Sequence, residues 1–193
     1  MVKRVFIIHG WEGYPEEGWF PWLKKELENR NFQVFVPAMP ETGHPRIETW
    51  VPHLAKLVGK LDKETYFVGH SIGCQTILRY LQTVKSPVGG AIFVAGWVSL
   101  TPMATRTKEE QAIAKPWFET PIDFVKIKKT SSHFTAIFSD DDPYVPLENI
   151  ATYREKLDAK IIIEKGKGHF SGEDNITKLP LVLKELLYMA RER

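Results

Sequence analysis

The stretch Val68-Gly69-His70-Ser71-Ile72-Gly73-Cys74 joins an apolar run to an amphipathic pattern. The run before it, 65–68, has the β-branched and aromatic residues of a buried strand. The residues after Ser71 place apolar side chains at i, i+3, i+4 and i+7, as an amphipathic helix does. A Gly-x-Ser-x-Gly sequence at such a strand-to-helix turn presents its serine at the end of the strand. Ser71 is therefore either a nucleophile or an ordinary serine that caps the helix.

The same alternation of strand and helix patterns runs through the whole chain. Short apolar runs typical of strands covered on both faces occur at 5–8, 32–36, 65–68, 90–95, 134–138 and 161–163. Amphipathic helices are expected at 19–30, 47–61, 71–83, 147–157 and 179–191. Pro52 leaves open where the second of these helices begins. The alternation predicts the α/β class, with one domain over 1–193 and a mostly parallel sheet of about six strands between helices.

One interval, 96–130, interrupts this alternation, because it contains no strand pattern. It holds several large apolar residues, among them Trp97, Met103, Trp117 and Phe118. Long excursions in compact domains are often lids or binding loops. We expect a small lid here; the alternative is a helical crossover with a few core aromatics.

Composition excludes several classes of protein. The 193 residues include 26 basic and 24 acidic side chains, so the net charge of +2 gives no nucleic-acid-binding surface. The single cysteine excludes a disulfide framework, and no apolar run approaches the length of a membrane span. Glycine-rich nucleotide-binding motifs are also absent. We expect a cytoplasmic protein without nucleic-acid or membrane partners and leave its oligomeric state open.

Two further features decide between the interpretations of Ser71. In hydrolases with this serine turn, an acid and then a histidine follow the serine along the chain. Three candidate acids, Asp140, Asp141 and Asp142, follow the fifth expected strand, and His169 follows the sixth. His44 is the only serious competitor of His169, but it precedes the serine. Because each candidate lies at the carboxyl end of a strand, where α/β proteins bind ligands, we interpret Ser71 as a nucleophile.

An enzyme that transfers acyl groups also needs backbone N–H donors for the oxyanion. One is expected from Ile72, the residue after the nucleophile. The other is expected from the loop after the first strand, where His9-Gly10-Trp11 makes Trp11 the best candidate. This chemistry requires no metal and no cofactor.

These residues resemble the RBBP9/YdeN family of small serine hydrolases in the α/β-hydrolase superfamily. The shared features are "IIHGWEG", "WLKKELE", "GHSIGC", "DDPYVP" and "GHF", which span almost the whole chain. The resemblance implies a three-layer α/β-hydrolase fold with a small or minimal lid. It implies Ser71, Asp142 and His169 as the catalytic triad, since Asp142 matches the pattern D-x-x-V-P. One branch binds a retinoblastoma-type protein through an L-x-C-x-E motif, which this sequence lacks.

The expected activity is hydrolysis of carboxylic esters of small acyl groups through an acyl-enzyme. Thioesters, lactones and activated amides use the same machinery, so the sequence does not name the natural substrate. The alternative is a protein-interaction module that keeps the hydrolase scaffold without catalysis.

Overall fold

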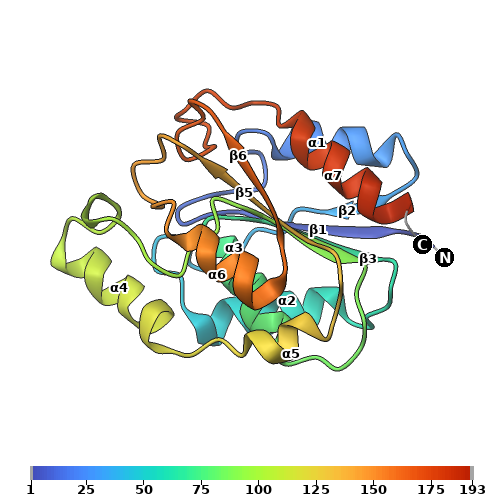
Figure 1. Cartoon of the computed structure of the whole chain (residues 1–193), viewed down its shortest axis with the longest axis horizontal. Coiled ribbons are helices and arrows are strands. Elements are labelled where there is room, and N and C mark those ends of the chain that lie inside the picture. The colour runs from blue at the N-terminus through green and yellow to red at the C-terminus, as the bar shows by residue number, and fades with distance from the viewer. Residues whose placement is uncertain (1, 192–193) are drawn as a thin grey trace.

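The computed structural model describes residues 2–191, and its centre is one wholly parallel sheet of six strands (Figure 1). The strand order is β2-β1-β3-β4-β5-β6. The strands are β1 (Arg4–Ile8), β2 (Gln33–Phe35), β3 (Thr65–His70), β4 (Gly90–Val94), β5 (Phe134–Ser139) and β6 (Lys160–Glu164). All six coincide with expected strands, and the α/β class is confirmed.

The register of the central strands brings three loops to one edge of the sheet. Ile8 at the end of β1 pairs with Gly69, and His70 at the end of β3 pairs with Val94 at the end of β4. Each of these strands is buried over most of its length, because helices cover both faces. The loops that follow β1, β3 and β4 are therefore neighbours, as they must be to form one site.

The helices form a layer on each face of the sheet (Figure 1). Helices α1 and α7 pack together on one face, and α2, α3, α5 and α6 lie on the other. Their bounds are α1 (Phe20–Glu28), α2 (Ile47–Val58), α3 (Ile72–Leu81), α4 (Lys108–Glu119), α5 (Phe124–Lys128), α6 (Asn149–Leu157) and α7 (Pro180–Arg191). Pro52 lies inside α2 and does not delay its start at Ile47. Within residues 2–191, no helix has the length and apolar character needed to cross a membrane.

The interval 96–130 is mainly helical and contains a 3-10 turn (Pro102–Ala104) followed by α4 and α5. Of its large apolar residues, Trp97 and Trp117 are buried in the core, whereas Met103 and Phe118 are largely exposed. The Trp117 indole donates to the Pro45 carbonyl at 2.9 Å, which ties α4 to the loop before α2. The interval therefore contains buried core aromatics, as expected of a helical crossover, and exposed apolar residues, as expected of a lid. Its opening and closing as a lid stays a prediction.

Candidate active site

Ser71 occupies the sharp turn between β3 and α3. Its backbone has φ 52° and ψ −121°, a region that residues other than glycine rarely adopt. Although Ser71 stands at the N-cap position, its side chain makes no capping hydrogen bond to the helix. The interpretation of Ser71 as an ordinary helix cap is therefore wrong. Such local strain persists where the surrounding structure imposes it, and it is concentrated at functional sites.

Two glycines allow this turn to form. A Cβ atom on Gly73 would collide with the carbonyl oxygen of Ile8 at the end of β1. A Cβ atom on Gly69 would lie 2.8 Å from the backbone of Cys74, closer than such atoms approach in proteins. The spacing of two residues on either side of Ser71 thus follows from the close packing of α3 against β1 and β3.

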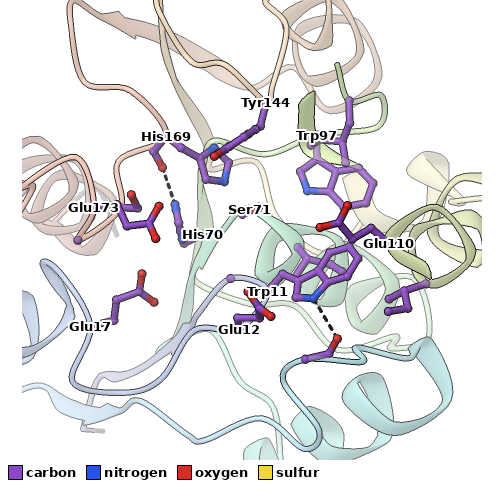
Figure 2. A pocket seen from close by; sticks show the side chains of 18 of the residues that line it. Trp11, Glu12, Glu17, His70, Ser71, Trp97, Glu110, Tyr144, His169 and Glu173 are labelled. Carbon is purple, nitrogen blue, oxygen red and sulfur yellow. Dashed lines mark hydrogen bonds between the residues drawn. The ribbon is translucent and has the colours of Figure 1, made fainter. Parts of the chain in front are cut away.

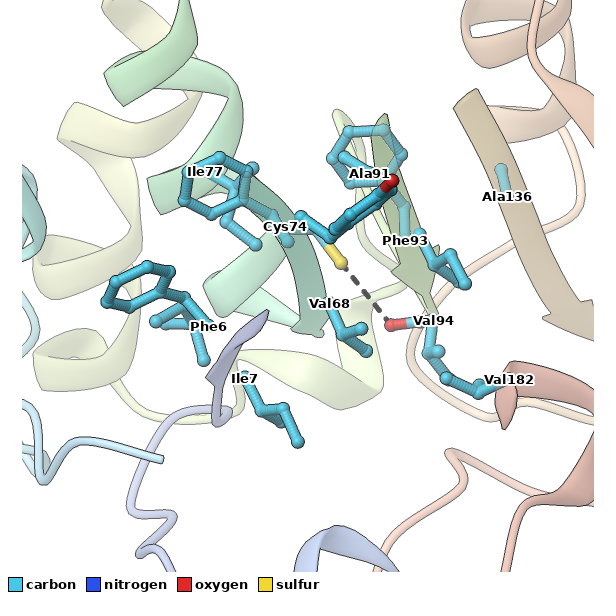
Figure 3. Close-up of a cluster of buried hydrophobic side chains, with 14 of the residues drawn as sticks. Phe6, Ile7, Val68, Cys74, Ile77, Ala91, Phe93, Val94, Ala136 and Val182 are labelled. Carbon is cyan, nitrogen blue, oxygen red and sulfur yellow. Dashed lines mark hydrogen bonds between the residues drawn. The ribbon is translucent and has the colours of Figure 1, made fainter. Parts of the chain in front are cut away.

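Cys74 lies one turn into α3 and is fully buried (Figure 3). Its Sγ is 3.4 Å from the Val94 carbonyl oxygen, and burial raises the pKa of the thiol. A protonated, inaccessible thiol is a poor nucleophile. We expect iodoacetamide to leave the folded protein unlabelled and Cys74→Ser to retain most of the hydrolase activity. Intact mass measures the labelling, and a rate assay measures the activity of the variant. Loss of activity on thiol alkylation, with Ser71→Ala still active, would identify Cys74 as the nucleophile.

His169 and Asp142 lie in contact, as the resemblance to the family implies. The Nδ1 atom of His169 lies 2.8 Å from Oδ2 of Asp142, whose side chain is 1% exposed. Oδ1 of Asp142 accepts from the backbone N–H groups of Tyr144 and Val145, so the carboxylate has a fixed orientation. Since the carboxylate accepts from Nδ1–H, the neutral ring leaves its Nε2 lone pair free to accept a proton.

The other two aspartates hold the histidine loop through its backbone. Asp140 accepts from the Gly166 N–H at 3.0 Å, and Asp141 accepts from the Gly168 N–H at 2.9 Å. The Ser139 hydroxyl, and next the Gly168 N–H, hold the pKa of Asp141 below its usual range. Each of the three consecutive carboxylates therefore bonds a different residue of the loop, and only Asp142 reaches the imidazole.

Sequence reasoning missed two residues that position His169. The Nε2–H of His70 donates to the His169 carbonyl at 2.7 Å, and Asp174 accepts from the His169 N–H at 3.0 Å. Burial lowers the pKa of His70 to about 3, so this donor stays neutral at physiological pH. Asp174 also accepts from Ser171, and the Ser-x-x-Asp spacing was a usable signal for this turn. No sequence signal pairs His70 with a residue 99 positions away.

The candidate oxyanion donors lie beside Ser71. Trp11 and Ile72 line the same cavity as Ser71 and His169. Among residues 2–191, neither backbone N–H donates to a side chain or to a backbone carbonyl of a turn, loop or helix cap. The Trp11 indole donates to the Gly43 carbonyl at 3.1 Å, which fixes the loop that carries this amide. Both amides are thus available to a ligand.

The cavity around Ser71 has a volume of about 920 Å³ (Figure 2). An apolar part of its wall comes from the interval 96–130 and includes Trp97, Leu100 and Ile113. His44 also lines the cavity, but it is exposed and its Nε2 lies 3.1 Å from a Glu109 carboxylate oxygen. Its competitor His169 is the histidine held by Asp142.

Known proteins are similar to this chain over all or most of its length. It is 33% identical over 195 residues to "Putative hydrolase YdeN" of Bacillus subtilis (strain 168), with 100% of this chain and 99% of that protein covered. It is 29% identical to "Serine hydrolase RBBP9" of Rattus norvegicus, covering 88% of this chain and 87% of the rat protein.

Solved structures agree with these relatives. The crystal structure of the B. subtilis ydeN product superimposes with a TM-score of 0.89 at 32% identity, covering 97% of this chain and 98% of that one. A carboxylesterase structure from the thaumarchaeon Nitrososphaera gargenis matches with a TM-score of 0.70 at 14% identity, over 100% and 92% of the chains, which shows the fold alone.

The family described as "Serine hydrolase" matches residues 5–188, which includes Ser71, Asp142 and His169. The expected resemblance to RBBP9 and YdeN is confirmed, and so is the α/β-hydrolase fold. The chain belongs to the serine hydrolase family.

Proposed function

We propose that this hydrolase cleaves carboxylic esters of small acyl groups through a Ser71–His169–Asp142 triad and an acyl-enzyme. The observation that carries the proposal is the shared cavity. It contains a serine with a strained backbone and no capping bond, and a histidine whose Nδ1 is held by a buried carboxylate. An activated serine requires such a base, and the base requires such an orienting group.

In the proposed reaction, Nε2 of His169 takes the hydroxyl proton as Ser71 attacks the ester carbonyl. Asp142 keeps the proton on Nδ1 of the neutral ring and stabilises the imidazolium that forms. The imidazolium then gives its proton to the leaving alcohol, and an acyl-Ser71 ester remains. A water molecule, deprotonated by His169, releases the carboxylic acid and restores the serine.

The backbone N–H groups of Trp11 and Ile72 are the proposed donors to the oxyanion. Their availability supports this role, since each lines the cavity without another acceptor in the described chain. Ile72 also begins α3, so the positive end of the helix dipole lies where negative charge develops. The apolar wall at Trp97, Leu100 and Ile113 suits the acyl group.

A fluorophosphonate tests the proposal directly, because it phosphonylates a serine only when the hydroxyl is activated. We expect the intact mass of the folded protein to rise by one phosphonyl group, and Ser71→Ala to remain unlabelled. We also expect the untreated wild-type protein to hydrolyse p-nitrophenyl esters with short acyl chains, and Ser71→Ala not to hydrolyse them. An unlabelled wild-type protein with a normal circular dichroism spectrum would favour the interaction module on a hydrolase scaffold.

A further inference from the structure

The charges that line the cavity are of one sign. Five glutamates contribute to its wall, and no lysine or arginine of the described chain does; the glutamates are Glu12, Glu17, Glu109, Glu110 and Glu173. The chain as a whole carries a net charge of +2, so this distribution is local to the pocket. A cleft lined by one sign of charge concentrates ligands of the opposite sign.

Two of these carboxylates lie together on one side of the pocket. Figure 2 shows Glu17 and Glu173 near each other, on the side of His70 and His169. Burial raises the pKa of Glu17, backbone hydrogen bonds at Tyr14 and Gly172 offset this in part, and the Glu173 charge raises it further. A cation held between the two carboxylates would favour the ionised form of Glu17.

Two of the remaining glutamates have partners among the described residues. Glu109 lies 3.1 Å from His44, and Glu110 accepts from backbone N–H groups at the start of α4. Glu17 and Glu173, by contrast, form no ion pair with any residue in the described range. No lysine or arginine of the described residues therefore pairs with these two carboxylates.

A second observation also points to a ligand in this pocket. Trp97 is 1% exposed, and its indole N–H has no hydrogen-bond partner in the described chain. Figure 2 shows the indole on the opposite side of Ser71 from Glu17 and Glu173, with its nitrogen turned towards the middle of the pocket. A buried donor without an acceptor is costly, and a ligand oxygen would satisfy it.

The position of the carboxylate pair indicates which part of a substrate it meets. In the proposed mechanism His169 protonates the leaving oxygen, so the leaving alcohol lies on the His169 side of Ser71. The Glu17 carboxylate interacts electrostatically with His169 as well as with Glu173. The acyl group then lies on the other side, against Trp97 and the apolar wall.

We propose that the pocket selects esters whose leaving alcohol carries an ammonium group, bound between Glu17 and Glu173. This inference rests on the proposed ester hydrolysis. The ammonium takes no part in the bond changes: the ester and one water give the carboxylic acid and the ammonium-bearing alcohol. Its attraction to the two carboxylates contributes to substrate binding and places the leaving oxygen beside His169.

The test compares two esters of the same shape, 2-(trimethylammonio)ethyl butanoate and 3,3-dimethylbutyl butanoate. They differ only in a quaternary nitrogen that replaces a quaternary carbon. We expect the wild-type protein to show a kcat/KM about tenfold higher for the cationic ester, mainly through a lower KM, as for a partly desolvated ion pair. Raising the salt concentration should reduce this ratio, because salt screens the attraction.

The double variant Glu17→Gln/Glu173→Gln should bring the ratio of the two kcat/KM values close to one. The ratio cancels any general loss of activity, which affects both esters equally. Glu16→Gln is the matched control, since Glu16 is exposed, adjoins Glu17 and does not line the cavity, so the ratio should stay at its wild-type value.

Equal kcat/KM for the two esters in the wild-type protein, or an unchanged ratio in the double variant, would overturn this inference and leave the proposed hydrolysis standing. If neither ester is hydrolysed and a fluorophosphonate leaves Ser71 unlabelled, the proposed function fails and this inference fails with it. A higher kcat/KM for the cationic ester that vanishes in the double variant and persists in Glu16→Gln supports the ammonium subsite.

Discussion

Ser71→Ala is expected to lower kcat for ester hydrolysis by about 10³-fold or more, as loss of a triad nucleophile does. The variant removes the only atom that forms the acyl-enzyme and leaves His169, Asp142 and both candidate oxyanion amides in place. KM should change little, since the cavity wall keeps its shape. The measurement is steady-state hydrolysis of one p-nitrophenyl ester by the wild type and the variant at equal concentration.

The same substitution should leave the fold intact, which separates catalysis from stability. The Ser71 side chain makes no capping bond, so alanine removes no hydrogen bond from α3. Alanine at φ 52° is strained as serine is, and Ser71→Gly provides a second variant that adopts this backbone without strain. Both should unfold near the wild-type temperature without activity. Hydrolysis at a near wild-type rate by either variant would exclude Ser71 as the nucleophile.

The six strands were predictable because each is a short apolar run that the parallel sheet buries. The ends of the strands were less predictable than their presence. For example, β3 continues through Gly69 and His70, because the turn at Ser71 is tighter than a strand pattern can indicate. Pro52 also left the start of α2 ambiguous, because a proline lacks the N–H of a helical residue. The helix contains it nevertheless, since α2 packs against α3. Contacts made by the folded chain determined both features.

Helix α4 was missed although its start is visible in the sequence. Thr107 and Glu110 form a capping box, with the threonine hydroxyl accepting from the Glu110 N–H and the glutamate accepting from the Thr107 N–H. The Thr-x-x-Glu spacing is a known helix signal. The large apolar residues that suggest a lid in this interval do not follow a single helical period, so the capping box is the clearest signal of this helix.

The order of serine, acid and histidine was readable from the chain, whereas the residues that hold them were not. His70 bonds a carbonyl 99 residues away, and Glu17 lies near Glu173 on one side of the cavity. Such pairs depend on which loops the strand order brings together. A single sequence does not show which residues far apart in the chain become neighbours. The three adjacent aspartates show the same limit in part, because only the D-x-x-V-P pattern of the family distinguishes Asp142, and the backbone partners of Asp140 and Asp141 have no such signal.

Asp142→Asn is expected to lower activity by several orders of magnitude, up to the 10⁴-fold loss seen when a triad aspartate is replaced. The asparagine keeps the size of the side chain and one oxygen that accepts from Tyr144 and Val145. Its amide nitrogen then faces Nδ1 of His169 and donates to it. The histidine is thereby held in the tautomer that carries its proton on Nε2, where it cannot take the proton of Ser71.

Asp140→Asn and Asp141→Asn are the matched controls, because they make the same chemical change on neighbouring residues of one turn. Each of these carboxylates accepts through Oδ1 from a backbone N–H of the histidine loop, and an asparagine oxygen accepts the same bond. Their activity should stay far above that of Asp142→Asn. The three variants are compared on one ester, with circular dichroism to verify folding and a fluorophosphonate to measure serine activation. If Asp141→Asn or Asp140→Asn is the inactive protein and Asp142→Asn retains activity, then the carboxylate bonded to His169 in the structure is not the one that orients it during catalysis.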